Sequence, residues 1–457
     1  MKTRRKKYLV EAVKCLTRKA KPTVRKLLNA DSMFAAIRQD FTQLPDHRAN
    51  NSRIPLADAL MSGFAVFSLK HPSLLAFEKH YEKEPDNLHR VYGVGIKPSD
   101  SQMREALDQV SPELLRQPFR TLFSRAQRGK ALEQLAWLDG HYLLALDGTG
   151  IYSSEKIGSN YCLQKRKRNG NTEYYMMMLA GAIVHPDHPE VIPICPEMIR
   201  HQDGSDKGDC ELNASRRLLP HLRQEHPHLK LVVIEDALGA NAPHIKDLIA
   251  NDLRFILAVK PTGHPSLFKQ IDLAVKERRA TEFTMADPED PRVSHAFRII
   301  KGVPLNKVSQ DELAVNVLEY WEVDARGQER RFSWVTDWEL TPENAYQVMR
   351  AGRARWRIEN ETFNTLKNQG YNLGHNYGLG EKHLCAVFAQ LMMLAFLVDQ
   401  LQQLACPLFQ AALQKCERKS YLWRQIRSCY DIFIAGSMTA ILNAIVDDVK
   451  VHLPDET

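Results

Sequence analysis

The stretch LKLVVIED, residues 229–236, decides the fold class. Its apolar run, Leu231–Ile234, is rich in β-branched residues and has no polar alternation, which is typical of a strand buried on both faces. APHIKDLIAN (242–251) then predicts a short helix, and RFILAVK (254–260) predicts another buried strand. The first of these strands ends in a carboxylate, Asp236, which makes the ends of the strands candidate positions for a functional site.

Similar runs lie upstream of this segment. HYLLALDG (141–148), YYMMMLAGAIV (174–184) and VIPI (191–194) predict three strands, and a helix is expected over 207–225. The order strand, strand, strand, helix, strand, helix, strand predicts an α/β fold with a mixed sheet flanked by helices. We expect HYLLALDG to stop at a turn, which places Asp147, like Asp236, at a strand end where ligands of such sheets gather.

The rest of the chain divides into segments of different character. Residues 1–135 predict a helical region, with Ser99 or Ser101 as a helix cap and Pro112 opening a further helix. Residues 136–290 hold the sheet, and alternating runs in 291–340 predict a β-rich insertion of antiparallel strands. Residues 341–457 are predicted to be helical, with helices over 380–448 that pack back on the sheet.

Charge is spread unevenly along the 457 residues. The formal net charge is +7, but residues 1–30 carry eleven Lys and Arg against one acid, a local charge of +10. Such an arm commonly contacts polyanions, and Arg4, Arg5, Lys6 and Lys7 are its densest cluster. A solvated tail without a partner is the alternative.

Neither a membrane span nor a disulfide framework is expected. The most apolar run, 386–398, has thirteen residues and contains Gln390, so it predicts a buried helix too short to cross a bilayer. The N-terminus lacks the apolar stretch of a secretory signal, which predicts a cytoplasmic protein. The eight cysteines are scattered without a Cys-x2-Cys pair, so they predict buried thiols rather than a zinc site.

The segment RARWRIENETFNTLKNQG, residues 353–370, carries two glutamates at different angles of one helix. At 100° per residue, Glu359 falls on the apolar stripe with Phe363 and Leu366, whereas Glu361 falls on the solvated face. A buried carboxylate needs a positive partner. That partner is either Arg355, four residues earlier, in a structural pair, or a metal ion.

Three carboxylates therefore stand out as one candidate site: Asp147, Asp236 and Glu359. Oxygen-only clusters of this kind suit Mg²⁺ or Mn²⁺, and two such ions can activate a nucleophile and stabilise the leaving oxygen of a phosphodiester. Each acid also has a structural interpretation. Asp147 is a common turn former before glycine, Asp236 can cap the helix near 242, and Glu359 can pair with Arg355.

These residues resemble the DDE transposases of bacterial insertion sequences, in the cut-and-paste branch with a Tyr-x2-Arg-x3-Glu-x6-Lys signature. LDGTGIYSS (146–154), VVIEDALGAN with KPTGH, and the segment from Arg353 to Gly378 are similar to its two Asp blocks and its Glu block, and the resemblance spans roughly residues 98–400. It implies a ribonuclease-H-like catalytic domain with a β-rich insertion before the Glu helix. It also implies Asp147, Asp236 and Glu359 as catalytic, metal-binding residues.

The signature itself is matched in part. Arg355 and Glu359 fit the Arg-x3-Glu step, but the Tyr position falls on Gly352 and the Lys position on Leu366, with Lys367 one place late. The register with Arg357 and Glu361 fits no better, and the helical face favours Glu359. The resemblance implies DNA-backbone contacts for Arg355 and Lys367.

Two softer motifs remain. The first is QKRKRNG (164–170), whose Lys165, Arg166, Lys167 and Arg168 either hold phosphates or form a solvated hairpin tip. The second is HQDGSDKGDCE (201–211), where a metal site is the less favoured alternative to a loop and helix cap; its candidate ligands are His201, Asp203, Asp206 and Asp209.

Together these observations predict a transposase that binds the terminal inverted repeats of its element and catalyses metal-dependent DNA cleavage and strand transfer. The expected cofactor is Mg²⁺ or Mn²⁺, with two ions. The expected partners are double-stranded DNA, as element ends and target, and a second copy of the chain in a homodimeric end-pairing complex, with no membrane. We expect it in the bacterial cytoplasm at the nucleoid. The alternatives are a catalytically inactive, transposase-derived DNA-binding regulator and a ribonuclease-H-like nuclease of another substrate.

Overall fold

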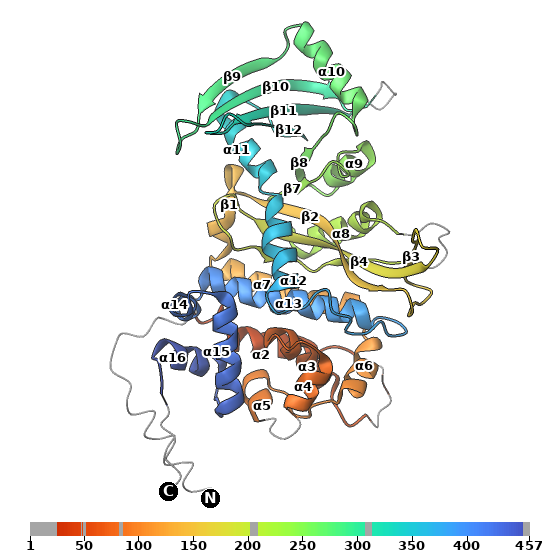
Figure 1. The fold of residues 1–457 in the computed structure, drawn as a ribbon, viewed down its shortest axis with the longest axis vertical. Helices are drawn as coiled ribbons and strands as arrows, with labels where there is room; N and C mark the ends of the chain where they lie inside the picture. The colour runs from red at the N-terminus through yellow and green to blue at the C-terminus, as the bar shows by residue number, and fades with distance from the viewer. Residues whose placement is uncertain are drawn as a thin grey trace, which may run out of the picture. The chain divides into compact units, whose positions relative to one another are not determined.

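A computed structural model describes residues 25–46, 48, 52–81, 86–201, 209–306 and 313–450 (Figure 1). The chain forms two compact units. One, the helical unit, takes its described residues from 1–131 and 365–457, and the other, the sheet unit, is formed by 132–364.

The helical unit combines helices from both ends of the sequence. The sequence predicted the C-terminal helices to pack on the sheet, but they form one unit with the N-terminal helices instead. Its elements are α2 (Ala30–Thr42), α3 (Leu56–Ser68), α4 (Leu74–His80), α5 (Asp86–Tyr92), α6 (Asp100–Asp108), η1 (Pro112–Leu115), α7 (Arg116–Arg128), α13 (Leu384–Ala405), α14 (Pro407–Cys416), α15 (Lys419–Ile432) and α16 (Met438–Val446).

Helix starts in this unit follow the sequence signals. Ser99 caps α6 in a reciprocal capping box with Gln102, so the first of the two predicted caps is correct. Pro112 opens a 3₁₀ turn, η1, rather than an α-helix. Asp108 accepts hydrogen bonds at 2.9–3.0 Å from the four successive amides of 381–384 at the start of α13. These bonds outweigh the opposing effect of desolvation and lower the pKa of Asp108.

Helix α13 is the core of the helical unit. Its 22 residues make it long and apolar enough to cross a membrane, so the expectation that this run is too short was wrong. All 22 residues are buried, however, as expected of a core helix. It also carries Asp399, which pairs with the buried Lys70 at 2.6 Å and accepts a hydrogen bond from Tyr371. Among the described cysteines no disulfide forms.

The sheet unit is built on one open, mixed sheet of twelve strands flanked by helices. The strands are β1 (Ala136–Trp137), β2 (His141–Ser154), β3 (Leu163–Arg166), β4 (Thr172–Val184), β5 (Ile192–Pro193), β6 (Glu197–Ile199), β7 (Leu231–Glu235), β8 (Arg254–Ala258), β9 (Thr281–Ala286), β10 (Ser294–Pro304), β11 (Ala314–Val323) and β12 (Glu329–Thr336). Its main path is β3-β4-β2-β7-β8-β12-β11-β10-β9. The α/β class and mixed sheet are as predicted.

This sheet has a parallel part and antiparallel parts. Strands β2, β7 and β8 are parallel neighbours, while the long strands β2 and β4 run antiparallel side by side (Figure 1). Its helical elements are η2 (Leu132–Leu135), η3 (Leu138–Gly140), α8 (Glu211–Glu225), α9 (Ala242–Ala250), α10 (Pro265–Lys276), α11 (Pro342–Arg353) and η4 (Ile358–Phe363); α12 (Asn364–Asn368) crosses the boundary between the units.

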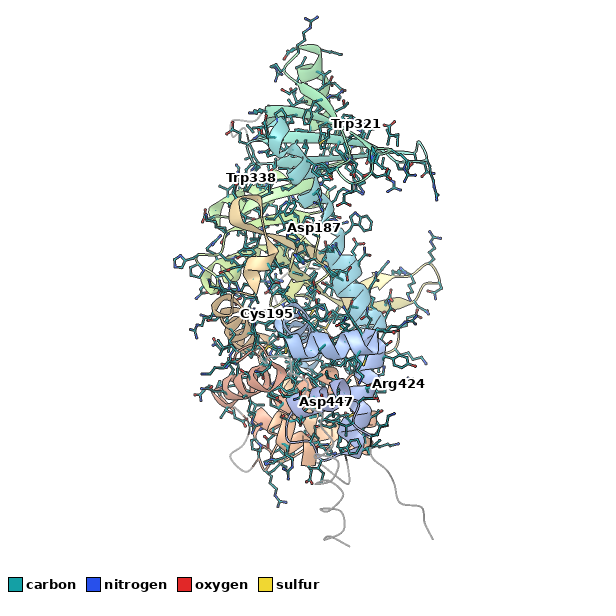
Figure 2. The ribbon with its side chains drawn as sticks, turned by 90° about the vertical axis from the view of Figure 1, so that its left-hand side faces the viewer. Asp187, Cys195, Trp321, Trp338, Arg424 and Asp447 are labelled. Atoms are coloured by element: carbon teal, nitrogen blue, oxygen red, sulfur yellow. The ribbon has the colours of Figure 1, made fainter. Side chains whose placement is uncertain are left out.

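The β-rich segment is antiparallel, as predicted, but it is not a separate body. It starts at β9 rather than at residue 291, and β12 pairs with β8, so β9–β12 continue the main sheet. Trp321, labelled in Figure 2, lies on β11. The centroid of its ring is 5.1 Å from the guanidinium carbon of Arg298 and 5.1 Å from that of Arg331. Those arginines pair with the buried Glu319, which ties three strands together.

Candidate active site

Asp147 lies in the middle of a strand rather than at a turn. The sequence predicted that HYLLALDG stops at Gly148, but β2 continues to Ser154, and Asp147 pairs with Ala180 on β4. The parallel partner β7 ends at Glu235, so β2 runs on past it. The turn interpretation of Asp147 is therefore wrong, and its carboxylate stands where the parallel part of the sheet ends.

Asp236 is exposed and directly follows β7. Its Oδ1 accepts a hydrogen bond from the amide of Leu238 at 2.8 Å, whereas Asn241 caps helix α9. The capping alternative for Asp236 is therefore excluded. The adjacent acid, Glu235, is buried and lies 2.7 Å from Nε2 of His244, so the two acids of the IED sequence face different surroundings.

The helix that carries Glu359 is not a regular α-helix. Helix α11 ends at Arg353, a turn follows, and Ile358–Phe363 form a π-helical turn, η4. The π turn changes the angle between successive residues, so the 100° wheel does not apply.

The face assignment of the two glutamates was consequently wrong. Glu359, expected on a buried stripe, has a side chain that is 37% exposed, whereas that of Glu361, expected on the solvated face, is 28% exposed. Trp356, three residues before Glu359, is 53% exposed. The buried residues of this turn are Ile358, Thr362 and Phe363.

Contacts rather than burial distinguish the two glutamates. Nη1 of Arg355 lies 3.0 Å from Oε1 of Glu359 and 3.1 Å from Oδ2 of Asp147. Arg357 instead pairs with Glu361 at 3.4 Å and donates to the carbonyl of Pro186. Of the two possible registers, the one with Arg355 and Glu359 therefore places its glutamate in the candidate site, bridged to Asp147 by Arg355.

Asp147 has an unusual protonation equilibrium. Burial raises its pKa to about 6, opposed chiefly by Arg355, with Glu359 and Asp236 raising it further. Asp236 and Glu359 lie 89 and 212 residues from Asp147 in the sequence, and the fold brings their charges close enough to act on it.

Sequence reasoning missed a fourth carboxylate, Glu211, in the first turn of α8. A Cβ placed on Gly148 would lie 2.0 Å from its Oε1, so the carboxylate packs against the residue that follows Asp147. Desolvation, Asp147 and Asp236 raise the pKa of Glu211. The signal available in the sequence was the Asp-Gly pair itself, because a glycine inside a strand often marks a close approach.

The donor set suits a hard divalent cation. Asp147, Asp236, Glu359 and Glu211 supply only carboxylate oxygens, and their mutual repulsion is what a cation would relieve. The oxygens of the three predicted ligands are not all within 4.8 Å of one another. Arg355 supplies the positive charge between two of them. The donor chemistry therefore suits Mg²⁺ or Mn²⁺, while in this structure Arg355 lies between Asp147 and Glu359.

The departures from the transposase signature have packing reasons. A side chain at Gly352 would meet the Trp334 ring, 2.5 Å from its Cβ position, so a tyrosine has no room there. Leu366 is fully buried, which excludes a lysine at that position, and the following Lys367 is exposed on α12.

The basic run 164–170 forms a hairpin between β3 and β4. Gly170 adopts a positive φ at its tip. Lys167 pairs with Glu155 at 2.6 Å and with Glu173 at 3.4 Å, while the other three basic side chains are exposed: Lys165, Arg166 and Arg168. The hairpin is thus seen, and phosphate binding by it stays a prediction. Arg4, Arg5, Lys6 and Lys7 lie outside the described residues.

The loop at 201–211 gives no support to its metal interpretation. Asp203 and Asp206 lie outside the described residues, and Asp209 pairs with Arg217 at 2.7 Å. Arg217 also holds Glu197 on β6, at 2.8 Å. His201 is half-buried, and its backbone amide donates to the carbonyl of Tyr161.

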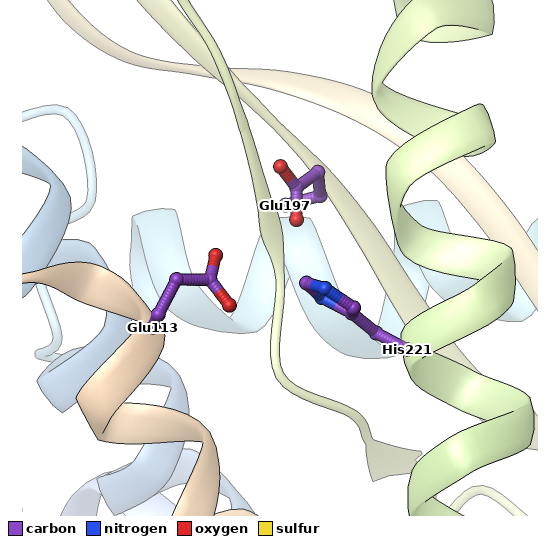
Figure 3. Close-up of side chains that lie close together, drawn as sticks. All are labelled: Glu113, Glu197 and His221. Atoms are coloured by element: carbon purple, nitrogen blue, oxygen red, sulfur yellow. The ribbon is translucent and has the colours of Figure 1, made fainter.

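A second group of potential ligands involves α8. In Figure 3, His221 on α8 and Glu197 on β6 point toward one another, with a ring nitrogen and a carboxylate oxygen within 4.8 Å. Glu113, also drawn there, belongs to the helical unit. Glu197 also pairs with Arg217 at 2.8 Å, and this group shares no residue with the four-carboxylate site.

A pocket of about 300 Å³ lies beside η4 in the sheet unit. Its arginines are already paired: Arg353 with Glu322, Arg357 with Glu361, and Arg350 with Asp187, which Figure 2 labels. The arginines of this pocket are thus neutralised by acids, and Glu361 lines the pocket whereas Glu359 does not.

The chain matches none of the protein-family models and none of the curated proteins with which it was compared. The functional conclusion therefore rests on the geometry of the site and on the resemblance of its motifs.

Proposed function

We propose that this protein is a DDE transposase with a ribonuclease-H-like catalytic domain, acting on double-stranded DNA at the terminal inverted repeats of an insertion sequence. The observation that carries the proposal is that one nitrogen of Arg355 lies 3.1 Å from Asp147 and 3.0 Å from Glu359, while Asp236 directly follows β7, the parallel neighbour of β2. The mixed sheet, with three parallel central strands and an antiparallel continuation, is compatible with it.

Asp147, Asp236 and Glu359 would hold the divalent cations, with Glu211 beside them. Bound Mg²⁺ or Mn²⁺ supplies Lewis acidity and a hydroxide-like nucleophile at neutral pH. In cleavage, a water oxygen bonds to phosphorus, the bond to the 3′ oxygen breaks, and a 3′ hydroxyl and a 5′ phosphate result. In strand transfer, that hydroxyl attacks a target phosphodiester and a new 3′ hydroxyl leaves.

The chain's own residues determine when the site is competent. The Asp147 pKa of about 6 means that this carboxylate is mainly ionised above that pH and can then hold a cation. The exposed bases of the β3–β4 hairpin, Lys367 and the N-terminal arm would neutralise DNA phosphates, which provides affinity without sequence selection.

The direct test uses duplexes that carry the inverted repeats flanking the gene. Asp147→Asn, Asp236→Asn and Glu359→Gln should each abolish Mg²⁺-dependent nicking and joining, while binding to the duplex stays within about twofold, since affinity comes mainly from basic contacts. An exposed acid of the same unit, Glu339, provides the control Glu339→Gln. Nicking by any of the three purified variants at the wild-type rate would rule out the assigned triad.

The proposal includes pairing of two DNA ends by two copies of the chain, in the cytoplasm at the nucleoid. An inactive DNA-binding regulator would bind the same duplexes without nicking them. A nuclease of another substrate would nick without preferring the repeats and without joining the ends. The same assay therefore separates the three functions.

A further inference from the structure

Arg355 occupies the position between two of the proposed cation ligands. One nitrogen, Nη1, is within 3.1 Å of both Oδ2 of Asp147 and Oε1 of Glu359, and the side chain is 14% exposed. Arg355 is also the strongest of the interactions that oppose the raised pKa of Asp147. A single guanidinium nitrogen shared by two carboxylates occupies the place of a cation that both of them could share.

Arg355 lies between two helical segments of different geometry, an α-helix and a π-helical turn. Helix α11 ends at Arg353, Ala354 and Arg355 form a turn, and the π-helical η4 starts at Ile358. The guanidinium carbon also lies 5.2 Å from the ring of Trp356, whose side chain is 53% exposed. Trp356 therefore offers the guanidinium a neighbouring aromatic face outside the carboxylate cluster.

We propose that Arg355 is a positioning residue that stands in for the cation: it holds Asp147 and Glu359 together in the metal-free protein and leaves them when the cation binds. The inference rests on the proposed function. Because Oδ2 of Asp147 and Oε1 of Glu359 both face Nη1 of Arg355, a cation shared by these two oxygens would have to displace the guanidinium, and Arg355 therefore lowers the affinity of the site for metal. Once released, its charge is free to meet the phosphate of a bound DNA strand.

A structural ion pair is the competing account, and the chain contains a matched example. Arg357 and Glu361 form the same i, i+4 pair two residues along, at 3.4 Å, without a carboxylate from the sheet. A variant of Arg357 thus removes an equal charge and an equivalent helical pair but leaves the Asp147–Glu359 bridge intact. Arg355→Met and Arg357→Met are the two variants to compare, because methionine keeps much of the length of the side chain.

The experiment measures Mn²⁺ binding to the full chain by isothermal titration calorimetry and metal-free melting temperature in EDTA, neither of which depends on activity. Arg355→Met should bind Mn²⁺ about tenfold more tightly, equivalent to about 1.4 kcal/mol, and melt lower without metal. Arg357→Met should bind as wild type does. Arg355→Lys keeps the charge but lacks the planar guanidinium, so its Mn²⁺ affinity should lie between those of wild type and Arg355→Met. It replaces Arg355→Met in the comparison if the methionine variant does not fold.

Unchanged or weaker Mn²⁺ binding by both Arg355 variants would overturn the inference and leave a structural pair. Equal tightening by Arg357→Met would also overturn it, since general charge would then account for the effect. Asp147→Asn separates this failure from failure of the proposed function: if it leaves Mn²⁺ binding unchanged, the carboxylate site is not the metal site, and both ideas fall. If it weakens binding while Arg355→Met does not strengthen it, only the stand-in role is wrong.

Discussion

Asp147 and Asp236 are separated by the same offset, 89 residues, as every paired position of the parallel ladder between β2 and β7, such as Tyr142 with Leu231. Continuing that register by two residues beyond Ala145 and Ile234 places the two acids opposite one another. Parallel neighbours lie about 4.8 Å apart and point to the same face of a sheet. The ladder ends at Ala145 and Ile234, so the sheet brings the first two acids to the same end of neighbouring strands.

Glu235 and Asp236 are adjacent in sequence, but the first is buried and the second is exposed, so the two positions can be compared directly. We expect Asp236→Asn to abolish cleavage and to change stability by less than about 0.5 kcal/mol, because its side chain is exposed. Glu235→Gln should instead destabilise the fold by about 2–4 kcal/mol, because it breaks a buried pair with His244. Urea unfolding and nicking, measured on both, check this. Cleavage by Asp236→Asn together with loss of cleavage in well-folded Glu235→Gln would exchange the two roles.

The two glutamates of η4 make a second comparison. Glu359→Gln should eliminate metal-dependent nicking, since Glu359 joins Asp147 through Arg355, and Glu361→Gln should retain it. Glu361 makes only a partly exposed pair with Arg357, and such pairs contribute about 0–1 kcal/mol. Nicking rates and melting temperatures of the two variants are the measurements. An active Glu359→Gln beside an inactive Glu361→Gln would favour the other register.

Much of the sheet followed from local patterns. The strands at 174–184 and 229–236 were predicted from apolar runs, and they appear as β4 and β7 with ends shifted by one or two residues. The continuation of β2 past Gly148 was not predictable in this way, because Asp-Gly is a turn signal. The strand continues to Ser154 because it pairs there with β4, a contact that local sequence does not reveal.

For the helix that carries the glutamates, the sequence selected Glu359, which contacts Arg355, but it predicted the wrong helix geometry. Glu359 was selected on an α-helical wheel, and the wheel was invalid because Ile358–Phe363 form a π turn. Periodicity has no means of anticipating a π turn, which tertiary contacts stabilise. The contact between Arg355 and Asp147, at 3.1 Å, supports the same residue on different grounds.

Glu211 offers a prediction that no motif contained. Glu211→Gln should raise the metal-free melting temperature, since it removes a charge that Asp147 and Asp236 repel, and should weaken Mn²⁺ binding. Gly148→Ala should displace the Glu211 carboxylate, because the new methyl group would lie 2.0 Å from Oε1, and should lower stability. Calorimetry with and without Mn²⁺ measures both effects. A lower metal-free melting temperature and unchanged Mn²⁺ affinity in Glu211→Gln would make Glu211 a structural residue of the α8 N-terminus.

The basic segments should differ in their contribution to DNA binding. Replacing Arg4, Arg5, Lys6 and Lys7 by glutamine should flatten the log–log dependence of affinity on salt by about 0.9 for each DNA phosphate that these side chains neutralise. The hairpin triple variant of Lys165, Arg166 and Arg168 tests the second segment in the same way. Fluorescence anisotropy at salt concentrations from about 50 to about 200 mM gives the slopes. Unchanged slopes in either variant would remove that segment from the DNA interface.

Asp147 sets the pH dependence of the metal-free protein. Its folded pKa of about 6 lies above the ordinary value of 3.8, so between these limits the folded state binds more protons than the unfolded chain. The free energy of unfolding should therefore fall as pH rises from about 4 to 6.5, by at most about 3 kcal/mol from this group. Asp147→Asn should flatten the profile over that window, leaving the smaller slope in the same direction that Glu211 contributes.

Urea unfolding in EDTA at half-unit steps of pH measures this profile, with Glu339→Gln as the control because it removes an exposed acid of the same unit. With Mn²⁺ present the sign should reverse, because only ionised Asp147 holds a cation, and stabilisation by the metal should decline as pH falls below about 6. Profiles of wild type and Asp147→Asn that coincide in EDTA would show that Asp147 titrates near its ordinary pKa. The desolvation of Asp147, which is the main cause of its raised pKa, would then be absent in solution.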